Sequence, residues 1–132
     1  MARQTVILCI DDNTTGLDIR QMLLQAKGFG VRTATDGLSG LEIINNEPID
    51  AVILDYKMPG MDGEEVAKRL RARHPHIPIL LLTGFAGLVP ESLLSMVDSF
   101  IEKGRSAALL VAEVERLTKP SGNAGAAEQR RA

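Results

Sequence analysis

The chain has 132 residues, one cysteine, no tryptophan and a formal net charge of −2 at pH 7. This length suits one domain with a core that needs no disulfide. The scattered lysines and arginines argue against nucleic acid or an acidic membrane surface as a partner. The sequence shows neither a membrane-spanning apolar stretch nor a signal peptide, and Cys9 lies inside an apolar run, so we expect a reducing, cytoplasmic location.

Strand-like apolar runs alternate with helix-like segments along the chain. The run at 6–10 predicts a strand, and the residues after it predict a helix over 14–27 that Gly28 ends with a left-handed cap. The apolar residues that share one face of this helix are Ile19, Met22, Leu23 and Ala26. A second strand is predicted near 30–35.

A turn at 36–37 leads into a predicted helix over 38–46. The side chains expected to point inward from it are Leu38, Leu41 and Ile44. The next strand is predicted at 51–54, and a helix near 62–73 follows it. The residues that this helix turns toward the sheet are Val66, Ala67 and Leu70.

The last third of the chain predicts two more pairs of strand and helix. The strands are expected at 79–82 and 99–102, and Pro90 suits the first turn of the helix between them. The apolar edge of that helix is formed by Leu93, Met96 and Val97. The final helix carries apolar residues at helical spacing, namely Ala107, Leu110, Val111, Val114 and Leu117. Residues 118–132 show no such spacing and are predicted to form a disordered tail.

Unbroken apolar strands that alternate with helices are typical of a parallel sheet covered on both faces. The predicted fold is therefore α/β, a three-layer doubly wound sheet of five parallel strands in a (βα)5 order. The predicted domain covers residues 1–117, and the sequence shows no sign of a second domain or an internal repeat.

Polar side chains follow four of the five predicted strands. Asp11 and Asp12 follow the first strand, Asp55 the third, Thr83 the fourth and Lys103 the fifth. The carboxyl ends of parallel strands meet in one crevice, where folds of this kind bind their ligands. Three carboxylates, a hydroxyl and an ammonium would converge there, and together they can hold a small hard cation and a phosphoryl group.

The motifs around these residues resemble the receiver domain of two-component response regulators. The motifs are Asp11-Asp12, Asp55 with the turn Met58-Pro59-Gly60-Met61-Asp62-Gly63, Thr83-Gly84, and Phe100-Ile101-Glu102-Lys103. They occur in the order expected for that family, and the resemblance covers about residues 5–117. It implies a flavodoxin-like fold and, because no output domain is attached, a stand-alone receiver that signals through protein contacts.

The resemblance also implies the chemistry of the site. Asp55 would be the nucleophile and become an aspartyl phosphate, with Lys103 and Thr83 contacting phosphoryl oxygens. Such a protein would catalyse only its own phosphorylation and dephosphorylation. Phe100 would change rotamer when Thr83 moves, so these two residues would form the switch.

Mg²⁺ is the implied cofactor. Asp12 and Asp55 would bind it directly, Asp11 would bind through water, and the backbone carbonyl of Lys57 would fill another position. An alternative for the two adjacent acids is a structural role as N-cap residues of the first helix, where the helix dipole favours negative charge.

The sequence departs from the common pattern of the family at two positions. Gly104 follows the lysine where a proline is usual, which is expected to loosen the loop before the last helix. Phe100 stands where tyrosine is commoner, which removes a hydroxyl from the switch. Lys57 and Phe85 occupy positions that tune the lifetime of the acyl phosphate in this family.

The implied phosphodonor is a histidine kinase or a phosphotransfer protein, and the implied output is contact with a downstream protein or a phosphorylation-dependent homodimer. Two alternatives stay open. A haloacid dehalogenase-type phosphohydrolase would use Asp11 as its nucleophile, and a non-phosphorylated interaction module would keep only the shape. A nucleotide-binding enzyme is disfavoured because the turn after the first strand lacks the required glycine spacing.

Overall fold

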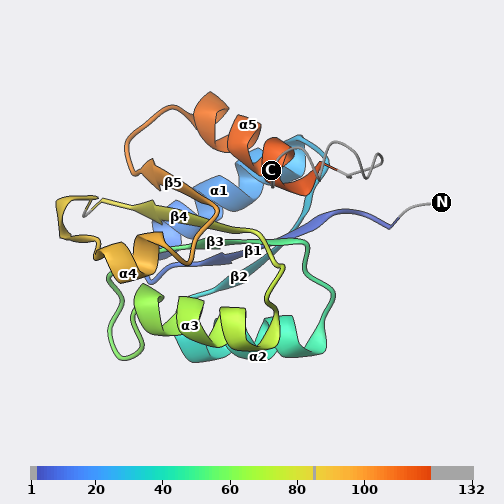
Figure 1. Cartoon of the computed structure of the whole chain (residues 1–132). Coiled ribbons are helices and arrows are strands. Elements are labelled where there is room, and N and C mark those ends of the chain that lie inside the picture. The colour runs from blue at the N-terminus through green and yellow to red at the C-terminus, as the bar shows by residue number, and fades with distance from the viewer. Residues whose placement is uncertain (1–2, 85, 120–132) are drawn as a thin grey trace, which may run out of the picture.

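A computed structural model describes residues 3–84 and 86–119 of the chain. Within these residues, five parallel strands form one sheet in the order β2-β1-β3-β4-β5 (Figure 1). The strands are β1 (Val6–Ile10), β2 (Gly30–Ala34), β3 (Ala51–Leu54), β4 (Ile79–Thr83) and β5 (Ser99–Glu102). The helices are α1 (Thr14–Ala26), α2 (Gly37–Asn46), α3 (Gly63–Arg73), α4 (Glu91–Leu94) and α5 (Ala107–Thr118), with a short 3-10 turn η1 (Ala86–Leu88) before α4. The predicted α/β fold is confirmed.

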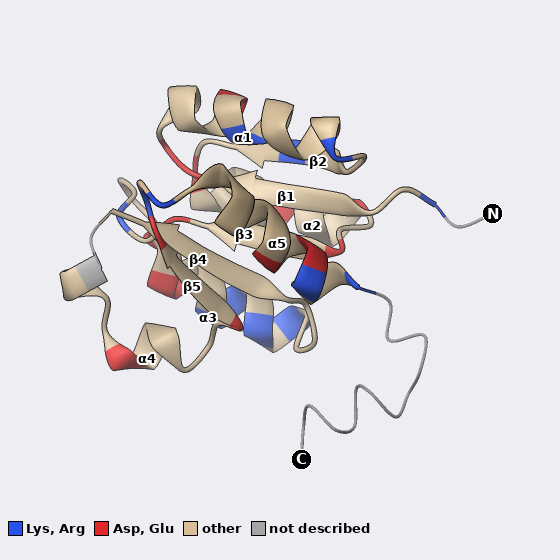
Figure 2. Ribbon diagram, turned by 90° about the horizontal axis from the view of Figure 1, so that it is seen from above, with Lys and Arg blue, Asp and Glu red and all other residues tan. Residues whose placement is uncertain are grey.

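Helices cover both faces of the sheet (Figure 1). Because side chains alternate along a strand, Ile7 and Cys9 of β1 pack with α1 and α5, whereas Leu8 and Ile10 pack with α2, α3 and α4. Cys9 is fully buried, and burial raises the pKa of its thiol to about 12, which confirms its interpretation as a core residue. Lysines and arginines are spread over several elements (Figure 2).

The longer helices begin at side-chain caps, whereas α4 does not. Asn13, Asp36, Asp62 and Ser106 each accept a hydrogen bond from a backbone N–H in the first turn of α1, α2, α3 and α5, respectively. The N-cap of the four-residue helix α4 is Pro90, which makes no such bond. Local sequence therefore stabilises four helices better than the fifth.

The apolar spacing noted in the sequence only partly marks the buried face of α1, where Leu23 packs, partly buried, against the core. The buried residues of this helix are Leu17, Arg20 and Leu24, whereas Ile19 and Met22 are 60% and 70% exposed. Two faces of this helix carry apolar residues at helical spacing. The face that packs on the sheet includes Arg20, so a pattern based on apolar residues alone does not identify it.

Leu38 is also placed wrongly, since it is 65% exposed. Helix α2 meets the sheet through Ile44 and Gly40, whereas the buried Gly37 faces Val66 of α3 and Met61. A Cβ atom at Gly40 would lie 2.4 Å from Cδ1 of Ile10, so a glycine permits this close approach. The inward positions Val66, Ala67 and Leu70 of α3 are confirmed, since each side chain is 0% exposed.

The helix ends are close to the predicted ones except in α4. This helix ends at Leu94, so Met96 and Val97 of its predicted apolar edge lie beyond it, partly buried against the core. Gly28 has φ of +95°, which confirms the left-handed cap after α1. The predicted tail begins one residue too early, because Thr118 still belongs to α5 and its Oγ1 donates to the carbonyl oxygen of Val114 at 2.8 Å. The rest of the predicted tail, residues 120–132, lies outside the described residues. Within the described ranges, no helix has the length and apolar character needed to cross a bilayer.

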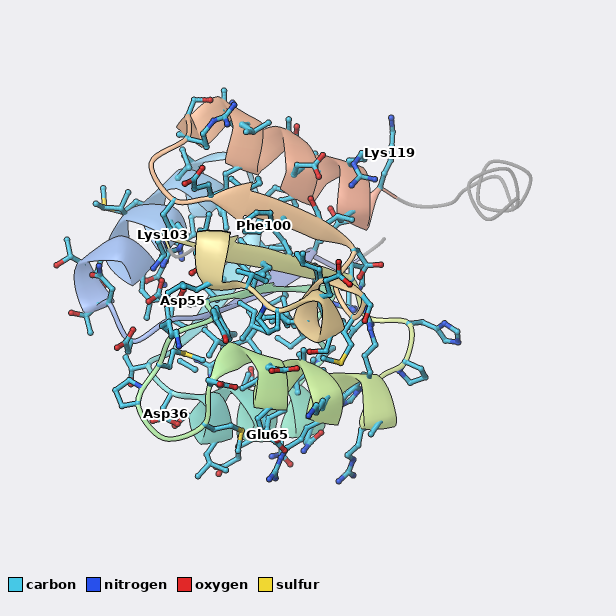
Figure 3. The ribbon with its side chains drawn as sticks, turned by 60° about the vertical axis from the view of Figure 1, so that its left-hand side comes forward. Asp36, Asp55, Glu65, Phe100, Lys103 and Lys119 are labelled. Atoms are coloured by element: carbon cyan, nitrogen blue, oxygen red, sulfur yellow. The ribbon has the colours of Figure 1, made fainter. Side chains whose placement is uncertain are left out.

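Both ends of the described chain lie at the amino edge of the sheet. Arg3 forms two hydrogen bonds, of 2.7 and 3.0 Å, to the carboxylate of Asp50, which also accepts the Val6 N–H at 2.8 Å. Lys119 borders a surface hollow together with Thr5, and Figure 3 shows it far from Asp55 and Lys103. Neither Arg3 nor Lys119 therefore lies at the carboxyl ends of the strands.

Candidate functional site

The carboxyl ends of β1 and β3 hold two buried acids. Asp11 is 2% exposed and Asp55 is 4% exposed. Their backbone N–H groups continue the strand ladders, since Asp11 N–H donates to Ala34 and Asp55 N–H to the carbonyl of Ile10, both at 3.0 Å. The two carboxylates are thus held at neighbouring points of the sheet edge, as the sequence predicts.

Three carboxylates can bind one cation at this edge. Oxygens of Asp11, Asp12 and Asp55 lie within 4.8 Å of one another, and Asp12 is exposed to solvent. Carboxylate oxygens are the ligands that Mg²⁺ prefers, and an open side leaves room for the waters that it keeps. The donor set fits the implied metal. The ammonium of Lys57 lies over the Tyr56 ring, 4.9 Å from its centre, and the role of the Lys57 carbonyl stays a prediction.

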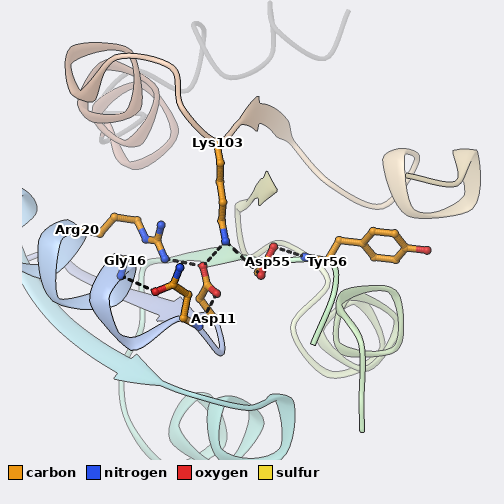
Figure 4. Close-up of polar contacts among 7 residues, drawn as sticks. Asp11, Gly16, Arg20, Asp55, Tyr56 and Lys103 are labelled. Carbon is orange, nitrogen blue, oxygen red and sulfur yellow. Dashed lines mark hydrogen bonds and ion pairs between the residues drawn. The ribbon is translucent and has the colours of Figure 1, made fainter. Parts of the chain in front are cut away.

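Lys103 reaches into this cluster from the end of β5. Its Nζ lies 2.8 Å from Oδ2 of Asp11 and 3.3 Å from Oδ2 of Asp55 (Figure 4). Its backbone N–H donates to the carbonyl of Thr83 at 2.9 Å, which joins the ends of β4 and β5. Thr83 is fully buried at the end of β4. All five polar residues predicted for the sheet edge therefore lie at this end of the sheet.

Arg20 is a further charged residue of the cluster that the sequence reasoning missed. Its Nη2 donates to Oδ2 of Asp11 at 2.6 Å, and its side chain is only 10% exposed (Figure 4). One signal in the sequence points to it. Gly16 stands four residues earlier, on the same side of α1, and a Cβ atom there would lie 3.2 Å from Arg20 Nη2.

The two buried acids differ in their affinity for a proton. Burial opposes ionisation of Asp11, but hydrogen bonds from Lys103 and the Asn13 N–H and the charge of Arg20 outweigh it and lower its pKa. Burial and then the negative charge of Asp11 raise the pKa of Asp55, against the opposing charge of Lys103. The surroundings therefore favour the ionised form of Asp11 more than that of Asp55. A nearby cation is needed more for the ionisation of Asp55 than for that of Asp11.

The turn after β3 fixes the position of Asp55. The Tyr56 N–H donates to Oδ1 of Asp55 at 2.8 Å, and the Tyr56 carbonyl accepts the Gly63 N–H at 2.7 Å. A Cβ atom at Gly63 would lie 2.2 Å from the Asp55 carbonyl oxygen, so α3 begins directly against the acid's backbone. Gly60 has φ of +77°, which confirms the expected glycine turn.

Phe100 and Gly104 lie on the β5 side of the site. Phe100 is 38% exposed, so its ring lies at the surface rather than in the core (Figure 3). Gly104 has φ of +96°, and the proline ring fixes φ near −65°, so this backbone conformation excludes proline. The departure from the family pattern at Gly104 is therefore matched by the local backbone. A loosened loop and a switching Phe100 stay predictions.

Comparison with known proteins identifies the family. The pattern of the response regulator receiver domain matches residues 7–115. The chain belongs to this family. The match favours the receiver interpretation over a phosphohydrolase with Asp11 as nucleophile.

Relatives of this receiver are response regulators of two-component systems. The transcriptional regulatory protein CseB of Streptomyces coelicolor is 30% identical over 131 residues, which cover 98% of this chain and 56% of CseB. The response regulator MprA of Mycobacterium sp. (strain KMS) is 40% identical over 77 residues, which cover 58% of this chain and 34% of MprA. The chain spans about half, or less, of the length of these curated relatives.

A solved structure shows the same fold over most of the chain. The response regulator TrrA of Thermotoga maritima, in complex with Mg²⁺ and BeF, is 29% identical to this receiver, with a TM-score of 0.82. The likeness covers 86% of this chain and 99% of TrrA. The flavodoxin-like (βα)5 architecture implied by the motifs is thereby confirmed.

Proposed function

We propose that this receiver accepts a phosphoryl group on Asp55 from a histidine kinase or a phosphotransfer protein, with Mg²⁺ as cofactor, and signals through protein contacts. The observation that carries the proposal is the placement of the buried Asp55 carboxylate, which has the Lys103 ammonium 3.3 Å from its Oδ2 and two further carboxylates beside it. A nucleophile, a fixed cation and a donor set for Mg²⁺ thus share one point.

The residues divide the chemistry among them. The Tyr56 N–H holds Oδ1 of Asp55, so Oδ2, on the Lys103 side, is the oxygen that attacks phosphorus. The new O–P bond forms as the P–N bond to the donor imidazole breaks. The donor ring carries a proton on its other nitrogen, so the imidazole keeps the electron pair of the broken bond and leaves as neutral histidine. Lys103 then neutralises a phosphoryl oxygen, and Thr83 donates its hydroxyl to another. Mg²⁺, when bound, supplies further positive charge to these oxygens.

Two relatives support the donor and the metal. TrrA was solved in complex with Mg²⁺ and BeF, which supports Mg²⁺ binding by the equivalent carboxylates here. The sensor histidine kinase GacS of Pseudomonas protegens contains a segment that is 38% identical to 90 residues of this chain, which supports a link to histidine kinases. The proposed output is a protein contact or a homodimer, built on Thr83 and Phe100.

Incubation with a small acyl phosphate or phosphoramidate and Mg²⁺ tests the proposal by intact mass spectrometry. We expect one added phosphoryl group that hydroxylamine removes, and no addition to Asp55→Asn. Asp62→Asn is the matched control, because Asp62 only caps α3 and lies outside the cluster. A label on Asp11, or one retained by Asp55→Asn, would contradict the proposal and favour the phosphohydrolase alternative.

Thermal melts with and without MgCl₂ test the metal. Mg²⁺ relieves repulsion among the three acids, so it is expected to stabilise the parent by about 2.7 kcal/mol at a hundredfold excess over its Kd. Asp12→Ala removes a proposed direct ligand and should abolish this response. An Asp12→Ala protein that responds to MgCl₂ like the parent would rule out the carboxylates as ligands.

A further inference from the structure

The Arg20 side chain is a buried cation beside the proposed metal site. It lies on the sheet-facing side of α1 between Leu17 and Leu24, and its guanidinium contacts Asp11 at 2.6 Å. An apolar residue at this position would pack against the same neighbours without the cost of removing a charge from water. Packing alone therefore does not account for an arginine at this position, whereas its charged contact with Asp11 does.

The surrounding helix provides room for this guanidinium. A Cβ atom at Gly16 would lie 3.2 Å from Nη2 and 3.4 Å from Nη1 of Arg20, so any larger residue would crowd it. Among the described residues, the buried Nε of Arg20 has no hydrogen-bond partner. The side chain also borders a hollow of about 420 Å³ between α1 and the β5–α5 segment. Its main fixed polar contact is therefore the one to Asp11.

Arg20 changes the charge balance and the free oxygens of the cluster. Two cations, Arg20 and Lys103, face the three carboxylates, and both contact the same oxygen, Oδ2 of Asp11. The other oxygen of Asp11 accepts the Asn13 N–H at 2.9 Å. Both oxygens of Asp11 therefore already have polar partners, and its Oδ2 faces two cations.

We propose that Arg20 is a built-in counter-ion that sets the Mg²⁺ affinity of the acidic cluster, holding the metal-free site together and weakening metal binding. The inference rests on the proposed function, because it assumes that the carboxylates bind Mg²⁺. The contacts of Arg20 and Lys103 with Oδ2 agree with the water-mediated position that the resemblance implies for Asp11. Arg20 is thus a positioning residue rather than a ligand.

Removing the charge should tighten Mg²⁺ binding. A fixed positive charge a few ångströms from a divalent cation is repulsive, and in a partly buried site solvent screens it poorly, so we expect the Kd of Arg20→Gln to fall about tenfold. Arg20→Lys keeps the charge and should bind Mg²⁺ within about threefold of the parent. Gly16→Ala, which crowds the guanidinium but leaves the charge in the chain, should give a smaller change in the direction of Arg20→Gln.

Titration with MgCl₂ can be followed by fluorescence of Tyr56, the single tyrosine in a chain without tryptophan, whose N–H binds Asp55. Thermal shift provides a second readout. Arg69→Gln is the matched control, because Arg69 makes an exposed ion pair on α3 and its loss changes the net charge equally. We expect its Kd to stay within about twofold of the parent.

The outcomes separate this inference from the proposed function. A parent that does not respond to MgCl₂ would overturn both. A parent that responds, with Arg20→Gln binding no tighter, would overturn only the role of Arg20. Equal tightening in Arg20→Lys and Arg20→Gln would assign the effect to packing and would also overturn it. If Arg20→Gln does not fold, Gly16→Ala decides, and a Kd equal to that of the parent counts against the inference.

Discussion

The acidic end of β1 and β3 and the edge formed by β4, α4 and β5 adjoin one another but are stabilised differently. Asp11 and Asp55 are buried and held by backbone N–H groups and by Lys103. The edge has a four-residue helix without a side-chain cap. Its exposed apolar residues are Leu88, Leu94 and Phe100, at 60%, 40% and 38%.

This difference suits two tasks. Phosphoryl transfer depends on fixed positions, which buried side chains on strand ends provide. A surface that changes on phosphorylation must open at low free energy, and segments with few buried contacts and unsupported helix ends do so most easily. The chain thus places the proposed nucleophile and the acidic ligands on the buried ends of β1 and β3, and the proposed output surface on α4 and β5, where the helix is short and has no side-chain cap. Five substitutions, each with a control or a partner for comparison, can break or sharpen this comparison.

Gly63→Ala should have the largest effect. The added Cβ would lie 2.2 Å from the Asp55 carbonyl oxygen and 2.8 Å from the Tyr56 Cα, and backbone atoms cannot move aside cheaply. We expect a loss of at least about 3 kcal/mol in the free energy of unfolding, measured by urea denaturation. Gly87→Ala is the control at the edge, where the Cβ would meet nothing within 4 Å, and it should change stability by about 0.5 kcal/mol or less. Equal losses of unfolding free energy in Gly63→Ala and Gly87→Ala would contradict the proposed difference between the two regions.

Leu70→Ala and Leu93→Ala compare fully buried leucines of α3 and α4. Each leaves a cavity, and Leu70→Ala should lower the free energy of unfolding by about 3 kcal/mol. Leu93→Ala should lower it less, because we expect the short, uncapped α4 to open without the rest of the domain. It should also speed amide hydrogen exchange at 91–102. Exchange in Leu93→Ala that rises evenly over all strands would show that α4 opens only with global unfolding.

Glu113→Gln tests a charged contact that holds the edge strand. Glu113 on α5 accepts hydrogen bonds from Arg116 and Ser99, and these bonds lower its pKa from 4.5 to about 2. Since the folded pKa lies below the unfolded one, this stabilisation is complete above about pH 4.5 and is lost as the pH falls toward 2. We expect Glu113→Gln to cost about 1 kcal/mol at pH 7.

That cost should disappear near pH 2 if the carboxylate is its source. The exposed Glu115→Gln on the same helix is the control and should change stability by less than about 0.5 kcal/mol. Urea denaturation of both variants between pH 2 and pH 7 checks this, and a Glu113→Gln deficit that does not vary with pH would argue against the ion pair.

Phe100→Ala should have the smallest effect on the domain itself. The ring is 38% exposed, so its loss should cost about 1 kcal/mol or less and leave phosphorylation near the parent rate. It should nevertheless uncouple phosphorylation from partner binding or dimerisation. Leu38→Ala, at an exposed site on α2, is the control and should leave this coupling intact.

Hydrogen exchange with and without phosphodonor provides the direct measurement. The parent should change mainly at 91–110, because Thr83 at the end of β4 and Phe100 on β5 lie on this side of the site. An unchanged 91–110 segment beside large changes elsewhere would refute the proposed output surface.

The sequence predicts the strands and their polar ends well, because each strand is a short apolar run and the acids and the lysine directly follow such runs. The turn glycines Gly28 and Gly60 are also readable, since few other residues adopt positive φ. What identifies the site is the order of the motifs around Asp55 and Lys103, because each single residue also has an ordinary structural explanation.

The inner face of α1 was not predictable from apolar spacing. Its buried stripe contains Arg20, whose partner Asp11 lies nine residues away, and only the fold brings the two charges together. The exposed Ile19 and Met22 form an equally regular apolar pattern, so the periodicity favours the wrong face. A buried acid's need for a counter-ion, together with Gly16 one turn before Arg20, is the signal that would have corrected it.

The position of both chain ends has a practical consequence. Lys119 lies far from Asp55 and Lys103 (Figure 3), and Arg3 pairs with Asp50, just before the amino end of β3. A tag, linker or reporter joined at Arg3 or Lys119 would therefore start on the side of the domain away from the acidic cluster. The receiver could be immobilised through one end and labelled through the other while a kinase and a metal ion still reach the opposite side.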